Sequence, residues 1–275
     1  MRWIVAALAL TFAADASADA PNARTLYVER RGVLELDARC RLFAPIVRAA
    51  LTATLQQAHN SLLRDGWNNA QVGNLEQTVV AAARARPCED QRTVSAAANA
   101  RQASAGWLRA NIMQFPGWSQ TWTAHRIAGA DGWRLNQTLA AGATFGVRVR
   151  DGREQLVLTV QTAHNQPVPR SVTLVMRDVR RSGATEIPLN QRVAFGLNAG
   201  APAPNVATSY TGVAMPGEAL RDGQTLAVFA FSDMAFGNLL ALDPRETAEL
   251  HVAGAPTLLS EVGDIGVARS FIVIR

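Results

Sequence analysis

In the first part of the chain, apolar side chains recur at every third or fourth position, which is the spacing of one face of an α-helix. This pattern predicts a helix from Asp37, a residue type that caps helices, to Asp65-Gly66. Pro45 lies near its start, so we expect the first turn to be kinked or separate. The apolar stripe of this helix consists of Leu36, Cys40, Phe43, Val47, Leu51, Leu55, Ala58 and Leu62.

The same spacing predicts two further helices. One spans residues 74–86 and is ended by Pro87. The other spans residues 89 to about 113 and is rich in Ala, which favours helix. Residues 37 to about 114 are therefore expected to form a module of three helices.

After Pro116-Gly117 the pattern changes to short alternating runs between clusters of Gly, Pro, Asn and Asp, which is typical of an antiparallel sandwich or barrel. A hairpin is predicted around Asp151-Gly152, because a two-residue turn there places apolar residues on one face and polar residues on the other. Its expected pairs are Arg150–Arg153, Val147–Leu156, Phe145–Leu158, Arg148–Gln155 and Thr144–Thr159. Further strands are expected at residues 121–127, 133–139, 172–179, 192–197, 207–214, 225–231, 247–252 and 269–274, with a short helix at 234–242.

These patterns predict an α+β protein, in which an N-terminal three-helix module is followed by an antiparallel β-sandwich-like or barrel-like domain. The expected boundaries are a signal peptide at residues 1–18, the helical module with one disulfide at 19–116, and the β domain at 117–275. Strands and helices do not alternate and GxGxxG is missing, which argues against a nucleotide-binding α/β fold.

The N-terminus resembles a secretory signal. Arg2 supplies a positive charge, and residues 4–14 form an eleven-residue run without charge, which is too short to span a bilayer. The small residues Ala16 and Ala18 suit a cleavage that leaves Asp19 as the first mature residue. The alternatives are an uncleaved anchor and a buried apolar strand. We expect an exported protein, periplasmic or secreted, with no integral membrane span in the mature chain.

Cys40 and Cys88 are the only cysteines, and their spacing matches no metal-binding motif. An even number of cysteines in an exported chain predicts a disulfide. The first two predicted helices should run antiparallel, which returns Cys88 toward Cys40. The alternative is a redox-active pair.

All 27 cationic residues are Arg, so the 275-residue chain cannot perform chemistry that needs a lysine amine. The use of Arg in place of Lys, together with the abundance of Ala, suggests a GC-rich bacterial genome. The net charge of +5 is small for this length and falls in short clusters, so we predict no nucleic-acid binding. The sequence likewise predicts no cofactor, no metal site and no identifiable catalytic residue.

Two groups of residues are candidate binding sites. Trp118, Trp122 and Trp133 flank the change from helices to strands, where they either pack the two parts together or form an aromatic platform for a glycan or peptide. Arg148, Arg150 and Arg153 surround the hairpin tip, where they are either solvated or hold an anionic partner.

The sequence favours an exported bacterial cell-envelope protein that acts as a non-catalytic binding or scaffolding module, with an envelope protein or glycan as partner. One alternative is an envelope hydrolase that acts on peptidoglycan or another glycan. Its residues would come from His125, His164, His251 and Glu249. The other alternative is a structural subunit of an envelope assembly.

Overall fold

The computed structural model describes residues 22–127, 132–162, 168–181, 183, 206–219 and 224–274. The predicted signal peptide at 1–18 and the strand predicted at 192–197 lie outside these ranges. Within them, an N-terminal group of helices is followed by an antiparallel sheet, which confirms the predicted α+β class. The boundary proposed at residues 116 and 117 stays a prediction.

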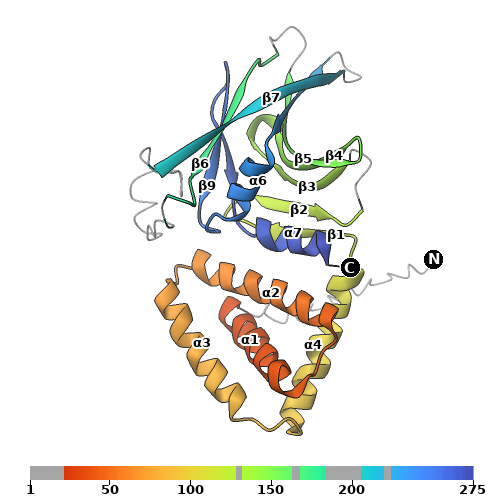
Figure 1. The fold of residues 1–275 in the computed structure, drawn as a ribbon, viewed down its shortest axis with the longest axis vertical. Helices are drawn as coiled ribbons and strands as arrows, with labels where there is room; N and C mark the ends of the chain where they lie inside the picture. The colour runs from red at the N-terminus through yellow and green to blue at the C-terminus, as the bar shows by residue number, and fades with distance from the viewer. Residues whose placement is uncertain are drawn as a thin grey trace, which may run out of the picture.

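The N-terminal region described by the structure contains four helices rather than the three that the sequence predicts. They are α1 (Ala23–Cys40), α2 (Pro45–Arg64), α3 (Asn69–Arg84) and α4 (Gln91–Arg109). In Figure 1, α1 lies between α3 and α4, and α2 runs across one end of this group. The helix α1 packs against all three of the others. No helix in the described ranges has the length and apolar character needed to cross a membrane.

The break between α1 and α2 explains why the prediction of one helix starting at Asp37 is wrong. Arg41 adopts a left-handed backbone conformation with φ 53°, and Pro45, which lacks an N–H, opens α2. Asp37 lies near the end of α1, where its carboxylate accepts hydrogen bonds from the N–H of Phe43, at 2.8 Å, and from Arg48. Asp37 therefore fixes the link between two helices instead of starting one.

In the described part of the chain, ten strands form a single antiparallel sheet. Its order is β1-β2-β3-β4-β5-β8-β7-β6-β9-β10. The strands are β1 (Ile112–Pro116), β2 (Thr121–His125), β3 (Trp133–Thr138), β4 (Thr144–Arg150), β5 (Arg153–Thr162), β6 (Val172–Arg177), β7 (Ala207–Ala219), β8 (Thr225–Phe231), β9 (Thr247–Val252) and β10 (Leu258–Glu261). The predicted register of the β4–β5 hairpin is confirmed at every pair.

Two predictions need correction, and two strands of the sheet, β1 and β10, have no counterpart in the sequence-based expectations. The third predicted helix ends at Arg109 instead of about 113, and residues 112–116 form β1, which pairs with β2. Residues 269–274 are not a strand, since they belong to the helix α7 (Ile265–Val273). The segment is apolar on most of its faces, so its spacing does not distinguish helix from strand. Strand β10 was not predicted, whereas the short helix at 234–242 is confirmed as α6 (Asp233–Leu240).

The two ends of the sheet are joined by side chains. On the β10 side, the backbone oxygen of Glu261 accepts hydrogen bonds from Trp122 Nε1 at 2.9 Å and Gln137 Nε2 at 3.1 Å. The carboxylate of Glu261 accepts hydrogen bonds from the N–H groups of Trp118 and Gln120, at 2.6 and 3.0 Å. These contacts give the sheet a barrel-like closure, and Trp122 and Gln137 are fully buried inside it.

The helical part is attached to the sheet through α7. Figure 1 shows α7 between α2 and the strands β1 and β2, and it packs against all three. Asp264, immediately before α7, is fully buried, and its carboxylate accepts hydrogen bonds from the guanidinium of Arg64 at 2.8 and 3.1 Å and from Asn60 at 2.9 Å. Nearby, the Arg126 guanidinium lies over the rings of Trp107 and Phe271. Both contacts fix the helices on the sheet.

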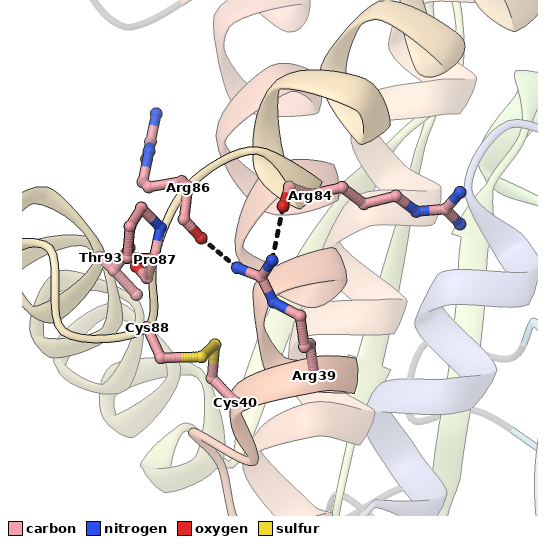
Figure 2. The surroundings of a disulfide bond; sticks show 7 residues. All are labelled: Arg39, Cys40, Arg84, Arg86, Pro87, Cys88 and Thr93. Atoms are coloured by element: carbon pink, nitrogen blue, oxygen red, sulfur yellow. Dashed lines mark hydrogen bonds between the residues drawn. A yellow bond between two sulfur atoms is a disulfide. The ribbon is translucent and has the colours of Figure 1, made fainter.

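A disulfide joins Cys40 and Cys88, as predicted. Cys40 is the last residue of α1, and Cys88 lies in the loop between α3 and α4, so the bond ties the C-terminal end of α1 to the loop that follows α3. Beside the bond, Arg39 donates hydrogen bonds to the carbonyl oxygens of Arg84 and Arg86 (Figure 2). This end of the helical group is therefore closed by one covalent bond and two hydrogen bonds.

We expect replacement of both cysteines by serine to lower the free energy of unfolding by about 4 kcal/mol. The bond closes a loop across 48 positions, and its loss returns conformational entropy to the unfolded chain. Chemical denaturation of the oxidised protein and the variant measures the difference. Reduction of the unmodified protein with dithiothreitol serves as the control and should cause the same loss, whereas a loss under about 1 kcal/mol would contradict this role.

We expect Asp264→Asn to lower the free energy of unfolding by about 3–5 kcal/mol, because the change leaves Arg64 buried without its carboxylate. Asp65→Asn is the matched control, since Asp65 is exposed and adjacent to Arg64 in the chain; it should shift stability by less than about 0.5 kcal/mol. Equal effects of the two changes in thermal and chemical denaturation would show that the buried ion pair does not hold the helices to the sheet.

Candidate functional site

A groove of about 740 Å³ lies among the four N-terminal helices. We call it the helical groove. Its walls are mostly apolar and come from every one of these helices, including Val33 of α1, Leu51 of α2, Val79 of α3 and Trp107 of α4. Pockets of this volume are within the range that holds small ligands in proteins, about 300–1,000 Å³.

Small side chains make up much of the wall that α4 contributes to the groove and part of the wall that α3 contributes. Ala82 projects from α3, and Ala96, Ala100 and Ala103 follow one another at helical spacing along α4. The helices α3 and α4 each pack against α1, which lies between them in Figure 1. Short side chains cannot fill the space that this arrangement leaves. The disulfide and the Arg39 hydrogen bonds hold the loop that connects α3 to α4.

The charged residues of the groove are mostly cationic. Arg24, Arg30 and Arg86 line it together with one carboxylate, that of the exposed residue Glu29. Burial lowers the pKa of Arg30, and the charge of Glu29 acts in the opposite direction without overcoming this effect. The Arg30 guanidinium donates a hydrogen bond to the carbonyl oxygen of Thr54, at 2.6 Å. In the described ranges, Arg30 forms no ion pair with a carboxylate.

The three predicted tryptophans occupy three different environments. Trp122 is fully buried in the main core and contacts Phe145, with ring centroids 6.3 Å apart. Trp133 is buried in a separate apolar cluster, with the guanidinium of Arg148 over its ring. Trp118 lies in the exposed link between β1 and β2. The structure therefore does not bring these rings together on one surface. Trp107 is the tryptophan that lines the helical groove.

The predicted arginine cluster lies on the β4–β5 hairpin. Arg150 and Arg153 are directly opposite each other across the turn, and Arg148 is paired with Gln155. Arg153 is exposed, while Arg148 and Arg150 are half-buried. The cluster lies on the sheet and contributes nothing to the lining of the helical groove.

The residues predicted for the alternative hydrolase are not gathered in one site. His125 is on β2, near Asn136, and His251 is on β9, where its Nε2 lies 2.7 Å from a carboxylate oxygen of Glu249. Strands β2 and β9 are not neighbours in the sheet. His164 lies outside the described residues. Within the ranges described, no three His, Cys, Asp or Glu side chains form a group that could hold a metal ion.

The spacing of apolar residues from Asp37 onward does not predict the helical groove, because it leaves out the helix α1. A signal for it exists, since Leu26, Arg30, Val33 and Leu36 recur at helical spacing and all line the groove. Comparison of the chain with models of protein families, with curated proteins and with solved structures finds no match. The proposed function of the chain therefore rests on the geometry of the groove.

Proposed function

We propose that this protein is an exported cell-envelope binding module, and that the helical groove is its binding site. The observation that carries the proposal is a mostly apolar groove of about 740 Å³ bounded by four helices. An apolar ligand gains free energy when it enters such a groove, because its own surface and that of the walls are removed from water.

The contacts around the groove favour a preformed site. The disulfide secures one end of the helical group, and the Arg64–Asp264 ion pair secures α2 against the sheet. A site that is held in its binding conformation loses less entropy when a ligand binds. In this proposal the β domain is the scaffold on which the groove is mounted.

Export is supported by the charge and apolar pattern of residues 1–18, and the Cys40–Cys88 disulfide is compatible with an oxidising compartment. We expect the full chain, when produced in a Gram-negative bacterium, to be recovered from the periplasm with Asp19 as its first residue. Cell fractionation, N-terminal sequencing and thiol titration measure the outcome. A chain without residues 1–18 is the control and should stay in the cytoplasm. Recovery of the full chain from the cytoplasm with an intact N-terminus would refute export.

We expect the mature protein to bind the neutral apolar dye N-phenyl-1-naphthylamine in the helical groove, with an increase in dye fluorescence. Ala103→Trp should reduce the affinity at least tenfold, because the indole occupies space that the dye needs. Ala98→Trp is the matched control, since Ala98 is also an exposed alanine of α4 but does not line the groove. Equal dye binding by both variants, or no binding by the mature protein, would overturn the proposal.

A further inference from the structure

We propose that the ligand of the helical groove is a long-chain fatty acid, whose carboxylate pairs with Arg30 and whose acyl chain lies along the apolar walls. This inference rests on the proposed function, because it names the class of molecule that the same groove would bind. It follows from three features of the groove: a half-buried cation that forms no ion pair in the described ranges, more cationic than anionic residues in the lining, and a mostly apolar surface.

The half-buried guanidinium of Arg30 is the feature that most strongly indicates an anionic ligand. A guanidinium is always charged and has five N–H donors. In the described structure, Arg30 is half-buried in the groove and donates to one carbonyl oxygen, that of Thr54. Burial without a paired carboxylate is costly for a charged group, which agrees with the lowered pKa of Arg30. An anion beside this guanidinium would offset the cost, and a carboxylate matches its planar pair of N–H groups.

The surrounding charges favour an anion over a cation. Arg24 and Arg86 also line the groove, whereas Glu29 is its one carboxylate and is exposed. A ligand with one negative charge can be held by Arg30, while the charge of Arg86 also acts on Asp90. A cationic ligand would be repelled by the Arg30 guanidinium. The charge of the groove therefore favours a ligand with an anionic head group.

The mostly apolar walls of the groove favour an apolar chain for the remainder of the ligand. Away from the arginines, most of the lining is formed by aliphatic and small side chains and by Trp107. The uncharged polar side chains are a minority of the wall and are Thr54, Gln57, Thr78, Asn99 and Ser104. A single flexible acyl chain suits such walls because it needs no polar partner along its length. One carboxylate joined to one apolar chain thus matches both the charge and the surface of the groove.

The test measures the displacement of N-phenyl-1-naphthylamine from the mature, disulfide-bonded protein by palmitate, used below the concentration at which it forms micelles. We expect palmitate to displace the dye. Myristate, which has two methylenes fewer, should bind about 15-fold more weakly if both groups are buried. Hexadecanol and hexadecylamine have the same chain length without the carboxylate, and they should compete at least tenfold less well than palmitate.

Arg30→Gln tests the role of the guanidinium. Glutamine is uncharged and keeps a hydrogen-bond donor at this position, so the helices should still pack, and an unchanged melting temperature verifies this. The dye affinity of the variant is measured separately, so that displacement of the dye can be converted into palmitate affinity. Palmitate affinity should fall about 10- to 100-fold, because a charge-assisted hydrogen bond is lost. Arg153→Gln is the matched control, since it removes an exposed arginine from the β4–β5 hairpin, and it should leave palmitate binding unchanged.

The outcomes separate this inference from the proposed function. If the dye binds in the groove but Arg30→Gln and the unmodified protein bind palmitate equally, the fatty-acid assignment is wrong and the binding function stands. If hexadecylamine competes as strongly as palmitate, the fatty-acid assignment is likewise wrong and the binding function stands. If the dye does not bind the mature protein at all, the proposed function itself fails.

Discussion

The buried contact between Arg64 and Asp264 couples the two parts of the molecule. Burying two charged groups is costly unless they are paired and hydrogen-bonded. Here the carboxylate of Asp264 accepts hydrogen bonds from two nitrogens of the Arg64 guanidinium and from the side-chain amide of Asn60. A contact of this kind tolerates little displacement. It fixes α2 against the start of α7, and α7 in turn packs on β1 and β2. Because α1 and α4 pack on α2, this ion pair positions the helical group together with the contact of Arg126 with Trp107 and Phe271.

The helical groove depends on the same contacts between the helices and the sheet, and on the small volume of the side chains that line it. Trp107 is one of its walls and also contacts Phe271 of α7, with ring centroids 5.3 Å apart, so the groove is continuous with the junction between helices and sheet. The alanines of α3 and α4 leave space that a core would otherwise fill. Well-packed interiors contain few such voids, which is why the proposal of a binding site rests on this apolar groove and its half-buried arginine.

The closure of the sheet explains why Trp122 is buried. Trp122 is enclosed because β10 returns to the first strands and its backbone accepts the indole N–H. A tryptophan used in this way gives the core a large apolar surface and satisfies its single polar group. The same ring, in a sheet that stayed open, would have been available to a ligand. Its role is therefore set by strands that are far from it in the sequence.

Local sequence was sufficient for the features whose determinants lie close together in the chain. The β4–β5 hairpin follows from a two-residue turn and from alternation on both sides of it, and the pairing of two cysteines leaves a single choice. The reason expected for that pairing was incomplete, since Cys40 ends α1 instead of lying in the first turn of a longer helix. Tertiary structure alone decided that residues 265–273 are helical, that residues 112–116 pair as a strand, and that four helices leave a groove beside Arg30. The helix and the groove depend on partners far along the chain, and the spacing of apolar residues does not record which partners those are. Residues 112–116 pair with the neighbouring residues 121–125, a contact that this spacing does not record either.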